Sequence, residues 1–353
     1  MARFLTLISL LLFTNCALAQ HRNVYLGVRY KRGFLIAHRP IMNHLPREHT
    51  NAVEVNAIFT SDGHRNWHEP MKHPYWGVTA LWTTSGNNAI LGSHFASYTY
   101  LMYPFIRLGK SSLLGRIGTG ASFSPKVFDQ QNNPKNIAIG SHVNALVNFA
   151  LLYQFTGDKH LWNFGLDFTH LSNGASKFPN LGINLPYLSL GYAYRIKSLS
   201  DREIATPGYS SDWKFQLIGI TSIKDINPIG SRRTPVFALN ASTQRIYKVG
   251  AGLESGLDIS YKPAIDSYKP VVYKEKQSLI QLGLYSAYLL TLDRLQFVLG
   301  MGFYIRDEYN PDDHTYHRIG LRYRVKDHVK LNLTLKSHWG KADFMEYGIA
   351  YEF

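Results

Sequence analysis

The stretch KHLWNFGLDFTHLSNGASKFPNLGINLPYLSLGYAYRI, residues 159–196, joins a strand pattern to a pair of reactive side chains. Its first part alternates in polarity, and large apolar side chains share one face: Trp162, Phe164, Leu166 and Phe168. Side chains alternate between the two faces of a strand, so His170 and Ser172 continue the apolar face. Their Cα atoms would lie about 6–7 Å apart, close enough for the side-chain tips to meet. The pattern therefore predicts a histidine placed to activate a serine.

Period-two segments of this kind recur along almost the whole chain. We expect sixteen, at about 24–30 (with 37 as an alternative end), 51–60, 76–83, 91–108, 112–124, 137–155, 159–172, 185–196, 213–221, 235–246, 247–262, 276–290, 294–306, 315–325, 329–338 and 342–353. Alternating segments of about ten residues between turn residues are typical of transmembrane β-barrels, whose apolar faces contact lipid. The sequence thus predicts an all-β, antiparallel outer-membrane barrel in which the aromatic face of 162–168, with His170 and Ser172, points outward.

Both ends of the chain carry export signals. Arg3 precedes the apolar run FLTLISLLLF, and Ala17-Leu18-Ala19 fits a cleavage motif, so residues 1–19 are predicted to be a signal peptide. The one cysteine lies in this peptide, so the mature chain can form no disulfide. The final segment ends on Phe353 and resembles the terminal strand that the barrel assembly machinery of outer-membrane proteins recognises. We expect the outer membrane of a Gram-negative bacterium, and export disfavours nucleic acid as a partner.

Two architectures fit the segments. The default is one barrel of 12–16 strands, and the alternative is two eight-stranded barrels divided near 198–210. Tight connections fall on one side and long polar ones on the other, as in outer-membrane barrels, except at 61–75 and 198–210. We divide the mature chain into 20–197, which carries the loop after His170, and 198–353, which supplies C-terminal barrel strands.

Two short motifs carry a family resemblance. HLSNG at 170–174 and PNLGIN at 179–184 are similar to the lipid A 3-O-deacylase family of outer-membrane barrels, also called acyloxyacyl hydrolases, over roughly 24–196. In that family the histidine and serine are the base and nucleophile of an esterase. In the family an acidic residue 14 positions beyond the histidine completes the triad, but this chain departs from that pattern, since the position holds Asn184, whose side chain is an amide. The HxSNG site also resembles outer-membrane phospholipase A, which has an asparagine at this offset.

The resemblance implies acyl transfer. Ser172 attacks an ester carbonyl, His170 carries the proton, and Asn184 holds the imidazole. Backbone N–H groups and side-chain amides of the loop would stabilise the oxyanion, with candidates Asn173, Gly174 and Asn180. The expected lipid is lipid A of lipopolysaccharide, with the active-site loop on the outer-leaflet side of the bilayer.

Charge and the remaining alternatives complete the prediction. The formal net charge of +14 suits a phosphorylated lipid, with candidate contacts at Lys177 and in the runs Tyr30-Lys31-Arg32 and Ser231-Arg232-Arg233. One alternative substrate is phospholipid, for which a calcium requirement stays open without assigned ligands. The other alternative is a non-catalytic pore or structural barrel. No cofactor-binding residue and no metal ligand is predicted.

Overall fold

The computed structural model describes residues 23–61, 63, 65–198, 211–225, 229, 233–263, 279–307 and 313–353. The expected signal peptide lies outside these residues. Within them the chain forms sixteen strands and one short 3₁₀ turn, η1 (Pro40–Met42). No helix in the described segments is long and apolar enough to cross a membrane. The all-β, antiparallel prediction is confirmed.

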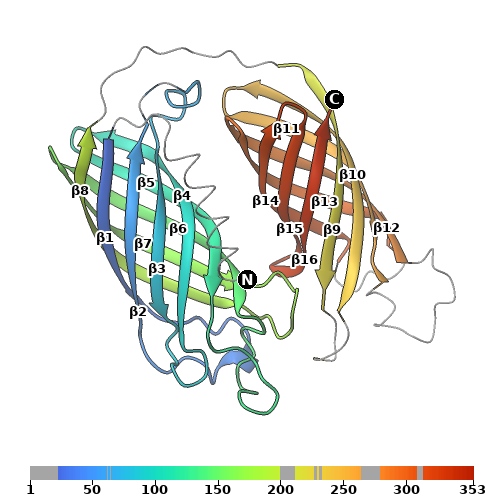
Figure 1. The fold of residues 1–353 in the computed structure, drawn as a ribbon, viewed down its shortest axis with the longest axis horizontal. Helices are drawn as coiled ribbons and strands as arrows, with labels where there is room; N and C mark the ends of the chain where they lie inside the picture. The colour runs from blue at the N-terminus through green and yellow to red at the C-terminus, as the bar shows by residue number, and fades with distance from the viewer. Residues whose placement is uncertain are drawn as a thin grey trace.

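The first eight strands close into a barrel of their own (Figure 1). Its strands are β1 (Asn23–Gly33), β2 (Thr50–Thr60), β3 (Tyr75–Thr84), β4 (Ser93–Leu108), β5 (Ser111–Phe123), β6 (Val143–Thr156), β7 (His160–Ser172) and β8 (Ile183–Ser198). Closure occurs because β8 pairs back onto β1 along its length, from Asn23 opposite Ser198 to Gly33 opposite Tyr187. After this pairing no free sheet edge is left for a ninth strand.

The second eight strands form another closed barrel. They are β9 (Trp213–Lys224), β10 (Thr234–Lys248), β11 (Ala251–Tyr261), β12 (Ile280–Leu292), β13 (Leu295–Arg306), β14 (Thr315–Lys326), β15 (Val329–His338) and β16 (Lys341–Glu352). The terminal strand β16 closes it by pairing with β9, with Tyr347 opposite Thr221. The single-barrel default is therefore wrong, and the alternative of two eight-stranded barrels is the observed architecture.

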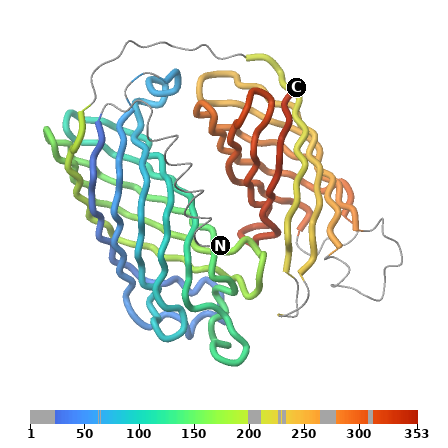
Figure 2. The backbone as a smooth tube through the Cα atoms, viewed as in Figure 1, coloured from blue at the N-terminus to red at the C-terminus, as the bar shows by residue number. Residues whose placement is uncertain are grey.

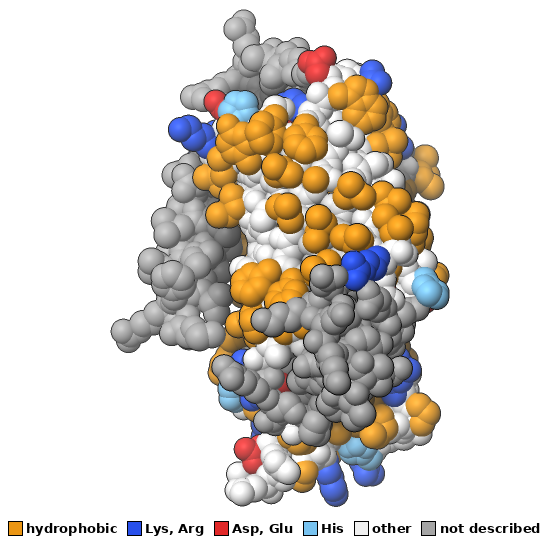
Figure 3. Space-filling view, turned by 90° about the vertical axis from the view of Figure 1, so that its right-hand side faces the viewer, with side chains coloured by type: hydrophobic (Ala, Val, Ile, Leu, Met, Phe, Trp, Pro, Cys, Tyr) orange, Lys and Arg blue, Asp and Glu red, His pale blue; other side chains and the backbone are white. Residues whose placement is uncertain are grey.

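Each wall has an apolar outside and a polar inside. On β7 the outward Trp162, Phe164 and Leu166 are between 49% and 61% exposed, while the intervening Asn163 and Asp167 are buried. The second barrel has the same alternation, and Figure 3 shows apolar side chains across much of its visible wall. The aromatic face of β7 thus points outward, as predicted, and carries His170 and Ser172 with it.

Paired charges fill the interior of the first barrel. Lys31 Nζ lies 2.9 Å from Asp167 Oδ1 and also contacts Glu54. Arg116 bridges the same two acids, at 3.2 Å from Glu54 and 2.6 Å from Asp167. The prediction that Lys31 contributes to a phosphate site on the rim is therefore wrong, because its ammonium is buried among these carboxylates. Eight-stranded barrels have room inside for side chains but little more.

The second barrel is filled in the same way by different residues. Arg318 joins Asp258 at 3.0 Å and Glu346 at 2.7 Å, and Arg322 pairs with Glu254. All five side chains are buried. Both interiors therefore match buried cations with buried carboxylates, which a low-dielectric interior requires.

The two barrels lie side by side and touch near both ends (Figure 2). At one end the β2–β3 connection, 61–74, reaches the second barrel, where Arg65 pairs with Asp293 at 2.5 Å. In the same contact Trp67 packs with Leu292 of β12. The exceptionally long connection expected at 61–75 is thus real, and it serves as a bridge between the barrels. The other exception, 198–210, lies almost wholly outside the described residues.

Candidate active site

The pairing of β7 with β8 builds the site on the outer wall of the first barrel. In the register of β7 and β8, His170 lies directly opposite Asn184. Directly opposite residues of an antiparallel pair point to the same face, so both side chains lie outside the barrel. Ser172, two residues further along β7, shares that face. The structure thus brings together the three residues that the sequence singled out.

These side chains form a continuous hydrogen-bonded chain. Ser172 Oγ is 2.9 Å from His170 Nε2, and His170 Nδ1 is 2.6 Å from Asn184 Oδ1. Asn184 Oδ1 can only accept, so the imidazole proton resides on Nδ1. Nε2 then keeps its lone pair and accepts from the serine hydroxyl. This is the protonation pattern that a general base needs.

The β7–β8 loop, 173–182, uses its two asparagines to hold its own shape. The backbone N–H of Asn173 donates to Asn180 Oδ1 at 2.9 Å. The side-chain amide of Asn173 donates to Ser141 Oγ at 2.8 Å and to the carbonyl of Lys177 at 2.7 Å. The backbone N–H of Asn173, expected as an oxyanion donor, is therefore engaged within the loop. Among the described residues, the N–H of Gly174 meets no hydrogen-bond acceptor.

Both glycines of the two motifs occupy positions that exclude a side chain. Gly182 has φ +81°, and a Cβ there would lie 2.8 Å from Cε1 of His170. Gly174 has φ +61°, and a Cβ there would lie 2.5 Å from Cγ of Met345. Such left-handed backbone is favourable for glycine and costly for most residues. Gly182 keeps space for the imidazole of His170, and Gly174 lets the second barrel approach the loop.

The second barrel holds this loop through Asp225, which follows β9. The N–H of Asp225 donates to the carbonyl of Ala175 at 3.1 Å, and its Oδ2 accepts from the N–H of Phe178 at 2.9 Å. Asp225 is buried, and Met345 of β16 covers Gly174 beside it. Sequence reasoning missed Asp225, since it lies 47 positions beyond Phe178 in a separate barrel and belongs to no motif.

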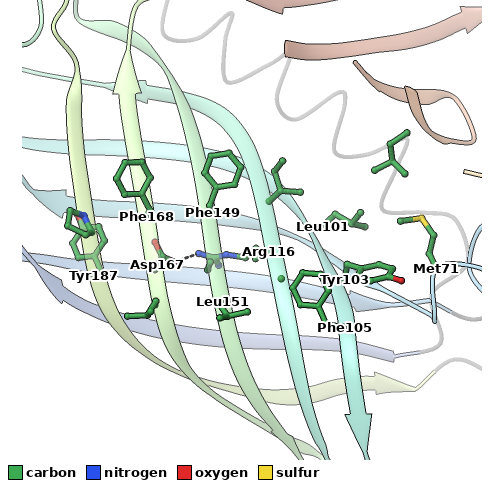
Figure 4. Close-up of a pocket in the computed structure, with 16 residues that line it drawn as sticks. Met71, Leu101, Tyr103, Phe105, Arg116, Phe149, Leu151, Asp167, Phe168 and Tyr187 are labelled. Atoms are coloured by element: carbon green, nitrogen blue, oxygen red, sulfur yellow. Dashed lines mark hydrogen bonds and ion pairs between the residues drawn. The ribbon is translucent and has the colours of Figure 1, made fainter. Parts of the chain in front are cut away.

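An apolar cavity of about 740 Å³ lies along the outer wall of the first barrel, and Figure 4 shows the residues that line it. Phe168, two residues before His170 on the same face, lines it together with its cross-strand partner Phe149. Met71 of the bridging connection and Leu290 of β12 also line it. The apolar face of β7 that carries Ser172 therefore also lines a cavity bordered by both barrels.

The other predicted contacts lie apart from one another. Lys177 is half-buried within the loop, and Arg32 is exposed near the end of β1. Ser231 and Arg232 lie outside the described residues. Within the described parts of the chain, no group of three or more His, Cys, Asp or Glu side chains is arranged to hold a metal ion.

The fold and the site together define a class, that of antiparallel β-barrel proteins carrying a serine–histidine–amide chain on the outer wall. Family models give the particular family. Residues 51–193 match lipid A 3-O-deacylase (PagL), and residues 212–353 match the acyloxyacyl hydrolase C-terminal domain. The two matches cover most of the chain, so the protein belongs to the lipid A 3-O-deacylase family.

Other comparisons add little. No curated protein matches the chain. Among solved structures, two variants of Rhodopseudomonas blastica porin are 8% and 9% identical and cover 94% of this chain and 99% of their own. Their TM-score is 0.18, and a score this low carries no argument about fold or function.

Proposed function

We propose that this protein is an outer-membrane serine esterase that hydrolyses an ester-linked acyl chain of lipid A. The observation that carries the proposal is the chain of hydrogen bonds from Ser172 through His170 to Asn184 on the outside of the first barrel. An outward position suits a substrate that is itself a membrane lipid, because the ester can approach from the bilayer without entering the filled interior.

In the proposed reaction Ser172 Oγ attacks the ester carbonyl while His170 Nε2 takes the hydroxyl proton. His170 then returns that proton to the leaving alkoxide, and water hydrolyses the acyl-serine by the same route. Asn184 Oδ1 accepts a hydrogen bond from Nδ1–H and so keeps the base in the required tautomer. An amide stabilises the imidazolium less than a carboxylate does, because it carries no full charge.

The oxyanion is assigned to the turn that follows the serine. Gly174 N–H is available there, and Asn180 offers its Nδ2 group while its Oδ1 accepts from Asn173. Asn173 becomes a supporting residue that shapes this turn. Lys177 lies in the same loop and supplies a positive charge for a phosphate of the lipid. The apolar cavity lined by Phe168 is the proposed place for an acyl chain.

The test offers purified protein lipid A and phospholipid in parallel, each with and without calcium, and follows products by mass spectrometry. We expect lipid A to lose one hydroxyacyl chain, with an empty-vector preparation showing no loss. Cleavage of phospholipid alone, in the presence of calcium, would replace the substrate assignment with that of a phospholipase. If both lipids remain intact, the non-catalytic alternative of a structural barrel replaces the proposal, since the filled interiors leave little room for a pore.

The hydrogen bond between Asp225 of the second barrel and the β7–β8 loop leads to a separate prediction. Asp225→Ala removes the acceptor for Phe178 N–H, and a hydrogen bond to a charged group contributes about 1.5–3 kcal/mol. We expect kcat/KM to fall by about ten- to a hundredfold, since the oxyanion turn loses support. Deacylation kinetics on lipid A would measure this fall in kcat/KM.

Two control variants sharpen that result. Asp225→Asn keeps an acceptor oxygen and should retain most of the activity, while Asp327→Ala, in the exposed β14–β15 turn, should leave kcat/KM unchanged. Full activity of Asp225→Ala would show that the loop keeps its shape without the second barrel.

A further inference from the structure

Asn184 has a second side-chain partner that the reaction scheme does not use. Its Nδ2 lies 3.0 Å from Nδ1 of His38, on the side away from His170. The hydrogen-bonded chain therefore has four members rather than three, running Ser172, His170, Asn184, His38. Nothing in the HxSNG and PNLGIN motifs includes His38.

The backbone carries His38 to this place. Beyond the end of β1, the N–H of Phe34 still donates to the carbonyl of Pro186 at 3.3 Å, and the N–H of Ile36 donates to that of Asn184 at 3.0 Å. The β1–β8 ladder thus continues past Gly33 in the same register. Residue 38 then lies two positions beyond the residue opposite Asn184, and alternation returns its side chain to the face of Asn184. Hydrogen bonds to β8 therefore continue as far as Ile36, and His38 lies two residues beyond the last of them.

An asparagine in this position has a problem that an acidic residue lacks. A carboxylate presents an acceptor oxygen whichever way it turns, but an amide has one acceptor end and one donor end. Turned the wrong way, Asn184 would point its NH₂ at the Nδ1–H of His170, and two donors would face each other. The imidazole would then lose the partner that holds its tautomer.

We propose that His38 is a positioning residue that sets the orientation of the Asn184 amide. With a lone pair on Nδ1, His38 accepts from Nδ2 and leaves Oδ1 facing His170. A wrongly turned amide would present Oδ1 to that lone pair and NH₂ to a donor, so it loses both hydrogen bonds. This inference rests on the proposed function, and it explains how an amide serves where the family has an acid.

A double-mutant cycle on the full-length protein tests the proposal. His38→Ala is expected to lower kcat for lipid A deacylation by about tenfold with KM little changed, the value of one orienting hydrogen bond. Asn184→Asp should remain active, because the isosteric carboxylate accepts from His170 in either orientation. In that background His38→Ala should change kcat by less than about twofold. A merely structural role for His38 would produce the same loss in both backgrounds.

The control variant is His44→Ala, in the same β1–β2 connection. Among the described residues, the His44 side chain bonds only to the carbonyls of Ile41 and Lys135. This substitution should leave kcat unchanged. Equal losses in the two backgrounds, a His38→Ala variant with the kcat of the wild type, or an inactive Asn184→Asp would each overturn the proposal.

A second readout separates this proposal from the proposed function. The rate at which a fluorophosphonate labels Ser172 reports activation of the hydroxyl whatever the natural lipid. Slower labelling in His38→Ala, restored in the double variant, would support positioning even if lipid A were not cleaved. If the protein cleaves lipid A but His38→Ala does not change the labelling rate, the positioning role of His38 is refuted and the proposed function stands.

Discussion

Replacing Ser172 with alanine is expected to abolish deacylation, lowering kcat by about four to six orders of magnitude. The expected loss is large because Ser172 Oγ forms the acyl-enzyme in the proposed reaction, and His170 Nε2, 2.9 Å away, has no other hydroxyl to activate among the described residues. The measurement is mass spectrometry of lipid A from cells that express either protein at matched levels.

Ser176→Ala is the matched control for this variant. Ser176 lies in the same loop, and among the described residues only its backbone N–H forms a hydrogen bond, to the carbonyl of Asn173. Its substitution should leave the lipid A profile like that of the wild type. Equal deacylation by wild type and Ser172→Ala would refute the serine mechanism. Loss of activity in Ser176→Ala as well would instead indicate damage to the loop.

The second large effect concerns folding of the first barrel. Glu54→Leu is expected to destabilise it by about 3–5 kcal/mol, the cost of breaking a buried ion pair by removing one partner. Glu54 is fully buried and faces three cations: Lys31, Arg29 and Arg116. With the Glu54 carboxylate removed, Asp167 is the one acid left beside the three cations. The uncompensated positive charge is costly because the cations are buried inside the filled barrel and cannot reach water.

Unfolding of the purified protein in detergent by urea, followed by circular dichroism, would measure that change. Glu48→Leu removes an exposed acid of the β1–β2 connection and should shift the free energy of unfolding by no more than about 0.5 kcal/mol. If Glu54→Leu unfolded at the wild-type urea concentration, the interior charges would contribute far less than their geometry indicates.

The sequence was sufficient to predict which side chains face outward from the barrel wall, but not how many barrels the strands form. Alternation along 162–168 placed the aromatic side chains and the His170–Ser172 pair on the outside, and the structure agrees. The number of barrels depends instead on whether β8 pairs with β1 or with β9. Alternating polarity is the same in either case, so the pattern could not exclude one large barrel.

The site shows the same division between local and distant information. His170, Ser172 and Asn184 lie within one hairpin, and their spacing alone brings them together. His38 bonds to Asn184 across 146 positions of sequence, next to an extension of the β1–β8 ladder. Asp225 bonds to Phe178 across 47 positions, through a contact between the barrels. Neither belongs to a motif with a regular spacing, so only the three-dimensional pairing reveals them.

The contact of Asp225 and Met345 with the β7–β8 loop has a consequence for the timing of activity. The nucleophile and base belong to the first half of the chain, whereas the support for the oxyanion turn includes a residue of the terminal strand. A half-assembled chain would therefore carry the reactive pair without a finished turn. Under the proposed function, lipid hydrolysis would reach its full rate only when the last strand is in place, so a chain still in transit would be a weak esterase toward the membranes that it passes.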